Sequence, residues 1–71
     1  MDAKTLAEQG KQEYAKGAFG VAADLFSQAA QAYENIQDEL NAAEMKNNQS
    51  VALLKAGKAE AALHATDGTE E

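Results

Sequence analysis

No proline interrupts this 71-residue chain, and alanine supplies 17 of its 32 apolar residues. Alanine is the strongest helix former, whereas the β-branched and aromatic residues that favour strands are few and scattered here. No stretch alternates apolar and polar residues as a half-buried strand does. The sequence therefore predicts an all-α fold in which small side chains let the helices approach one another closely.

Large apolar side chains, which fill the core of most small domains, are scarce. Leu, Ile, Val and Phe together number 11, a share below the roughly 20% that, with a high net charge, is typical of disordered chains. We expect the chain to fold nevertheless, because alanine loses little side-chain entropy in a helix. Its stability margin is expected to be thin, so that part of the stability depends on a neighbour.

Charge and composition disfavour several classes of function. Twelve acidic residues against six Lys and no Arg give a net charge of −6, whereas binding of nucleic acid needs a basic surface. The chain has no Cys, and so neither disulfides nor thiolate metal sites are possible. Its longest apolar runs are too short for a membrane span or a signal peptide. We expect a cytoplasmic protein that contacts neither nucleic acid nor membrane.

The first half of the chain predicts a helical hairpin. Helices are expected over about 2–16 and 18–36, joined at Gly17, because glycine readily adopts the left-handed conformation that ends a helix. The second of these helices has the clearest amphipathic stripe in the chain. The stripe consists of Phe19, Ala22, Phe26, Ala29, Ala30, Tyr33 and Ile36.

The second half is expected to begin a similar hairpin. A third helix should start at Asp38 or Glu39, because carboxylates favour a helix N-terminus. We expect it to end at Gly57 in another turn and to be followed by a short fourth helix that contains Leu63. Residues 67–71 are predicted to form a polar tail.

A forty-residue shift superimposes Gly57 on Gly17, so that both predicted turns coincide. A helix, a tight turn and a returning helix, repeated at a fixed period, are typical of a solenoid of stacked units. The sequence therefore predicts one helical domain over 1–66, with repeat one over 2–37 and a partial repeat two over 38–66.

The spacing of small and aromatic residues in the first unit resembles a tetratricopeptide repeat. The residues that carry this resemblance are Leu6, Gln9, Gly10, Gly17, Phe19, Ala22, Phe26 and Ala29. The forty-residue period is similar to that of the extended subclass of these repeats. The resemblance implies one and a half to two antiparallel helix-turn-helix units with three to four helices. Glu13 and Lys46 depart from the family pattern, which usually has a large apolar residue at both positions.

The resemblance also implies a concave groove that is lined by the first helix of each unit and binds a partner peptide or helix. The groove residues that it implies are Lys4, Ala7, Lys11, Tyr14, Glu44, Asn47, Asn48, Val51 and Lys55. One subclass of the family holds a peptide's terminal carboxylate with Lys and Asn. Asn48 matches that pattern, whereas Ala7 and Lys11 do not, so the full clamp is absent. Lys11 and Asn48 either hold an acidic group between them or are solvated surface residues.

Catalytic and metal-binding patterns find no support. His64 is the only histidine and has no thiolate partner. Ser27 and Ser50 have no His or Lys at helical spacing that would accept a proton. We therefore expect no catalytic residue, no cofactor and no metal.

Together these features predict a non-catalytic protein–protein interaction module. It is expected to bind a partner in the groove, to self-associate through an unfinished solenoid end, or both, because fewer than about three such units are seldom stable alone. The neighbour is then either a longer array of which this chain is a piece or a second copy. Such a homodimer is predicted to bury Leu53, Leu54, Leu63 and the faces of Phe19 and Phe26.

Two alternatives remain open. The chain also resembles a microtubule-interacting-and-transport domain in its length and in the stretch from Tyr14 to Tyr33, and the third helix of that three-helix bundle runs unbroken. The other alternative is a regulatory segment of a larger enzyme, in which the alanine-rich groove accepts a small molecule.

Overall fold

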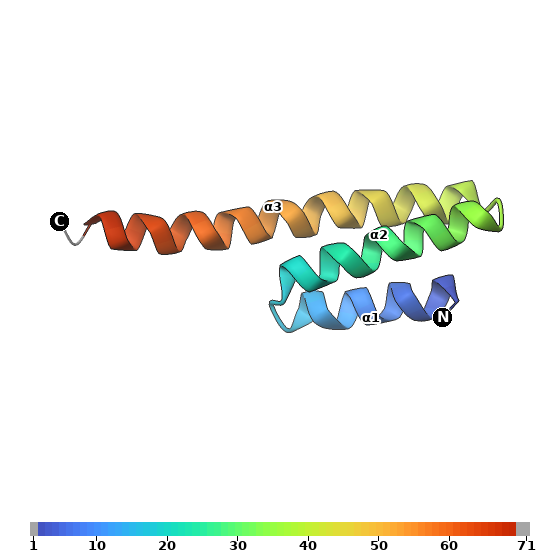
Figure 1. Ribbon diagram of the computed structural model, residues 1–71, viewed down its shortest axis with the longest axis horizontal. Coiled ribbons are helices and arrows are strands. Elements are labelled where there is room, and N and C mark those ends of the chain that lie inside the picture. Colours follow the sequence, from blue (N-terminus) through green and yellow to red (C-terminus); the bar gives the residue numbers. More distant parts are fainter. Residues whose placement is uncertain (1, 70–71) are drawn as a thin grey trace.

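A computed structural model describes the backbone of residues 2–69 and the side chains of residues 2–57. Three helices make up this part of the chain: α1 (Ala3–Ala15), α2 (Phe19–Asn35) and α3 (Glu39–Thr69). α1 and α2 form an antiparallel hairpin, and α3 returns along α2 and runs past its far end (Figure 1). The described residues contain no strand, and the all-α prediction is confirmed.

Aspartates cap α1 and α3, and the start of α3 was predicted from its carboxylates. The Thr5 backbone N–H donates to Asp2 Oδ1 over 2.8 Å at the start of α1. Hydrogen bonds from the side chain and the backbone of Thr5 lower the pKa of Asp2 below its ordinary value of 3.8. At the start of α3, Asp38 accepts from the Asn41 backbone N–H over 3.3 Å and from Asn41 Nδ2 over 2.7 Å. Both caps satisfy N–H groups that have no partner within the helix.

The two turns share one hydrogen-bonding pattern. Gly17 has a φ of 87° and donates to the Tyr14 carbonyl over 3.0 Å, which confirms the predicted first turn. Gln37 occupies the equivalent place after α2, with a φ of 61° and a 2.9 Å bond to the Glu34 carbonyl. The left-handed conformation is rare for a side chain such as glutamine.

The predicted turn at Gly57 and the separate fourth helix are wrong. α3 continues without a break from Glu39 to Thr69, and Gly57 is exposed within it. A glycine inside a helix costs about 1 kcal/mol relative to alanine but does not end the helix, and the Lys and Ala residues around it are good helix formers. The predicted tail overlaps this helix at residues 67–69, while residues 70 and 71 lie outside the described part.

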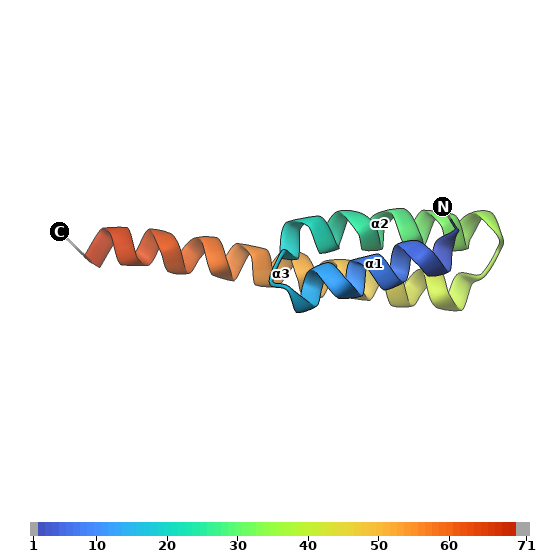
Figure 2. The ribbon, with the colours of Figure 1, turned by 90° about the horizontal axis from the view of Figure 1, so that it is seen from below.

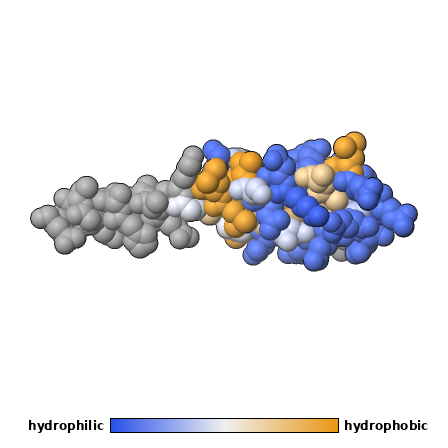
Figure 3. Space-filling model, turned by 90° about the horizontal axis from the view of Figure 1, so that it is seen from above, coloured by the Kyte–Doolittle hydropathy of each residue, from blue (hydrophilic) through white to orange (hydrophobic). Residues whose placement is uncertain are grey.

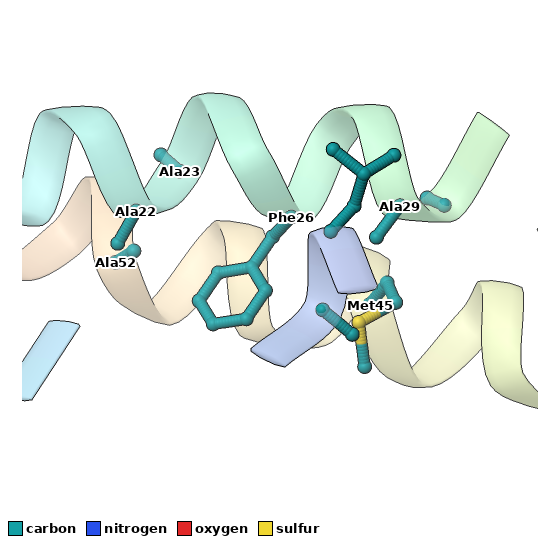
Figure 4. Packing of buried hydrophobic residues seen from close by; sticks show 9 residues of the cluster. Ala22, Ala23, Phe26, Ala29, Met45 and Ala52 are labelled. Carbon is teal, nitrogen blue, oxygen red and sulfur yellow. The ribbon is translucent and has the colours of Figure 1, made fainter. Parts of the chain in front are cut away.

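Alanines and one aromatic ring form most of the core, in which α2 packs against both α1 and α3. A Cβ on Gly10 would lie 2.8 Å from Phe26 Cε1, so the ring occupies the space that a side chain at Gly10 would need. Ala22 faces Ala52, and Met45 lies near Ala29 (Figure 4). The prediction that small residues sit where the helices cross is confirmed for Gly10, Ala22 and Ala29.

The expected dimer core is wrong at Phe26. Its side chain is only 3% exposed because most of the ring fills the hairpin interior, so it is already buried within one chain and cannot form the core of a dimer. Phe19 is half-buried and packs against Tyr14, whereas Leu53 and Leu54 are exposed. The side chain of Leu63 lies outside the described residues.

Candidate functional site

A groove lies between α1 and α3, with α2 as its floor. Its volume is about 290 Å³. The residues that line it are Lys11 and Tyr14 from α1, Phe26 from α2, and Asn48 and Val51 from α3. Seen from below, α1 lies in front of the other two helices (Figure 2). Four of the nine predicted groove residues therefore meet at one site.

Helical spacing brings these side chains to the groove. Lys11 and Tyr14 are three residues apart on α1, and Asn48 and Val51 are three apart on α3, so each pair shares one helix face. Because α2 packs against both of these helices, the two faces flank the same stretch of α2. Phe26, which belongs to that stretch, forms the floor.

A cationic and aromatic group lies beside the groove at Tyr14. The Tyr14 and Phe19 rings meet edge to face, with their centroids 5.2 Å apart and their planes at 72°. Lys55 Nζ lies 5.7 Å from the Tyr14 centroid and 6.0 Å from the Phe19 centroid. These distances are within the range of a cation–π interaction. The predicted groove residue Lys55 thus reaches from α3 to α1 without lining the pocket itself.

The other predicted residues lie outside the pocket. Lys4, Glu44 and Asn47 are exposed but are not among its lining residues. Ala7 is only 6% exposed, because it packs in the core between α1 and α2. Ala7 therefore offers no surface to a partner.

Phe26 was predicted as part of the amphipathic stripe and of a dimer face, and its role as the groove floor was not predicted. The same ring that fills the space beside Gly10 also borders the pocket between α1 and α3. Its position at the centre of the amphipathic stripe was the available signal, since a large side chain at the middle of a three-helix arrangement contacts both flanking helices.

The groove carries positive charge in a protein of net charge −6. Lys11 is in its wall, Lys55 lies beside it, and no acidic residue lines it. Within the described part of the chain, the two ion pairs lie elsewhere, from Lys16 to Glu13 at 3.2 Å and from Lys46 to Glu34 at 2.6 Å. The groove amines are therefore not neutralised by these acidic groups.

The described residues contain no group of three or more His, Cys, Asp or Glu side chains that could hold a metal ion. None of the described helices combines the length and the apolar character that crossing a bilayer requires. The side chain of His64 lies outside the described residues.

Comparison of the chain with protein-family models, curated proteins and solved structures gives no match. The resemblance to tetratricopeptide repeats therefore stays a prediction from the residues that carry it.

Proposed function

We propose that this chain is a non-catalytic interaction module that binds an acidic segment of another polypeptide in the groove between α1 and α3. The main support is the pocket itself, which Lys11 from α1 and Asn48 from α3 line together with the apolar residues Phe26 and Val51. An acidic side chain beside a large apolar one matches this arrangement, with the apolar group over Phe26 and the carboxylate between the two polar residues.

The size of the pocket favours a polypeptide over a small molecule. Its volume of about 290 Å³ is at the lower limit of the roughly 300–1,000 Å³ that small-molecule sites occupy. A pocket of this volume accommodates one large side chain, while the open groove leaves room for the neighbouring residues of a peptide. The proposal therefore ranks above a regulatory segment that accepts a small molecule.

The positive charge of the groove favours a partner with carboxylate groups. A lysine ammonium binds a carboxylate with little demand on geometry, and the Asn48 amide has N–H groups to donate beside it. The negative charges elsewhere on the chain act weakly at the groove, since the Debye length at physiological salt is about 8 Å. Binding is expected to weaken as salt is added.

We propose a cytoplasmic location for the chain. Its architecture is either that of tetratricopeptide repeats or that of the three-helix alternative. The unbroken α3 favours the three-helix alternative over two complete helical pairs. Both architectures bind polypeptides, so the proposed function is the same for each.

Selection from a random peptide library displayed on phage tests the proposal. We expect enriched peptides to combine Asp or Glu with a neighbouring large apolar residue. The double variant Lys11→Glu with Asn48→Ala should weaken the binding of such a peptide by about tenfold or more. Lys16→Glu is the matched control, since it makes the same charge change on an exposed residue outside the pocket.

The control should bind as the unchanged chain does, and circular dichroism should show the same helicity in all three proteins. Failure to enrich acidic peptides, or equal binding by the double variant, would contradict the proposal.

A further inference from the structure

Three exposed apolar side chains lie away from the groove. Leu40 is 83% exposed, Ile36 is 66% exposed and Leu54 is 60% exposed, the highest values among the large apolar residues of the described part. α3 packs on α2 through a different set of residues, which includes Ala42, Met45 and Ala52. α3 therefore has apolar residues on a second face that no other part of the described chain covers.

This second face has a regular spacing. Its residues recur at alternating steps of three and four, the spacing by which two helices pack side by side. We call this set the outer seam: Leu40, Ala43, Asn47, Ser50, Leu54 and Gly57, all of them exposed. In the view onto α3, apolar atoms gather near the α2–α3 turn and again where α3 leaves the hairpin (Figure 3).

We infer that the outer seam binds the outer seam of a second copy of this chain, with the two α3 helices antiparallel and a twofold axis between Asn47 and Ser50. In this register Leu40 lies opposite Gly57 of the second copy, and Leu54 lies opposite Ala43. Every leucine then meets a small residue, so the surface is complementary to itself, as a twofold interface requires. Parallel pairing sets each leucine against its own counterpart and each glycine against a glycine, which crowds some layers and leaves gaps in others.

The centre of the seam fixes the register. Asn47 lies opposite Ser50 of the second copy in the two central layers, where the amide and the hydroxyl are able to exchange a hydrogen bond. A slip by one heptad sets Asn47 against Gly57 or Ala43, neither of which has a polar side chain to pair with it. A single buried Asn specifies register in helix pairs for this reason.

The register also places one copy's α3 beside the other copy's α2–α3 turn. Beyond Gly57, α3 continues to Thr69 and passes the end of α2 (Figure 1). An isolated helical segment of about 12 residues is marginal in water. In the inferred pair, the first residues of α3 after Gly57 lie beside the other copy's α2–α3 turn, where Ile36 is exposed, and the rest of α3 extends past that turn. One pair of helices buries less than the roughly 1,200–2,000 Å² of a stable interface, so a weak, concentration-dependent dimer is expected.

Sedimentation equilibrium over a range of concentrations measures the dimerisation of the chain and of variants in which the large and small residues of one layer are exchanged. Gly57→Leu should weaken dimerisation by about tenfold or more, because it sets leucine against Leu40 of the second copy. The variant monomer should stay folded, since nothing lies within 4 Å of a Cβ at this position and leucine is the better helix former. Adding Leu40→Ala moves the large residue to the other side of the layer and should restore dimerisation.

Val21→Glu is the control, because Val21 is 53% exposed but belongs to α2 and not to the outer seam. It should leave dimerisation unchanged. A chain that stays monomeric at every concentration, a Gly57→Leu variant that dimerises as well as the unchanged chain, or a swap that fails to restore association would overturn the inference.

Spin-label distances test the orientation, since the chain has no native cysteine. Labels on Lys46→Cys should be close together across the twofold axis. Labels on Lys58→Cys should be separated by about 28 Å along the helices. In this register the two labelled positions are about 19 residues apart along the helix axis, and each residue adds a rise of about 1.5 Å. Short distances at both positions would indicate parallel helices and overturn the inference. Lys11→Glu should change neither result, so failure of the groove proposal is distinguishable from failure of this one.

Discussion

Gly10 and Gly57 are both glycines within a helix, yet their surroundings are opposite. A Cβ at Gly10 would meet the Phe26 ring at 2.8 Å, whereas a Cβ at Gly57 would meet nothing within 4 Å. At Gly10 the absence of a side chain lets α1 approach α2, and at Gly57 no packing within the chain requires it. The role of a helical glycine therefore depends on what lies opposite it.

Enlarging Gly10 should have the greatest effect on stability. Gly10→Leu is expected to lower the free energy of unfolding by about 2–3 kcal/mol, because the buried Phe26 ring has to move. Urea unfolding measures this change. Gly20→Leu is the control, since nothing lies within 4 Å of a Cβ there, and it should cost far less. Equal losses in the two variants would mean that the contact with Phe26 is not what restricts Gly10.

Gly17 provides an intermediate case, because its backbone conformation restricts it while its surroundings do not. Its φ is 87°, and nothing lies within 4 Å of a Cβ. Gly17→Ala is expected to lower the free energy of unfolding by about 1 kcal/mol, the cost of the left-handed conformation for a residue with a Cβ. The unfolding midpoint in urea should fall, and a midpoint that rises would contradict the assigned turn.

Gly57 should respond in the opposite direction. Gly57→Ala in a dilute, monomeric sample is expected to raise stability by about 0.5–1 kcal/mol, because alanine is the better helix former and has open space. Circular dichroism during thermal unfolding measures the change. A clear loss of stability would indicate that Gly57 adopts a turn conformation in solution.

The smallest expected effect on stability comes from Asp2, which caps α1. The contribution of Asp2 depends on its charge, whereas the contributions of the glycines depend on the space around them. Since hydrogen bonds from Thr5 lower the pKa of Asp2 in the folded state, its contribution to stability is complete above its unfolded pKa. That contribution is lost as the pH falls through the lower, folded pKa. NMR titration of the Asp2 carboxyl group should give a pKa below the ordinary value, and Thr5→Ala should raise it. An unshifted pKa would contradict the cap.

The sequence predicted the helices well where a local interaction decides the boundary. Asp2 and Asp38 cap helices that begin at the expected places, and Gly17 ends the first one. The prediction failed at Gly57, which like Gly17 has a lysine within the two residues before it. A glycine in that setting is compatible with both a turn and a helix. Gln37 shows the converse, since a turn forms there without any glycine.

The groove was predicted only in part for a related reason. The resemblance to tetratricopeptide repeats implied groove positions for Lys11 and Asn48, and both do line one pocket. It also implied a groove position for Ala7, which packs in the core against α2 instead. The way α1 packs on α2 decides which side of the helix stays open, and that packing includes the Gly10–Phe26 contact between residues 16 positions apart in the sequence.

NMR titration of the ¹⁵N-labelled chain with an enriched acidic peptide tests whether the groove between α1 and α3 binds the partner. The largest amide shift changes are expected on the groove residues of α1 and α3, namely Lys11, Tyr14, Asn48 and Val51. Saturable changes centred on the outer seam of α3, or no saturable change at the groove, would contradict this proposal.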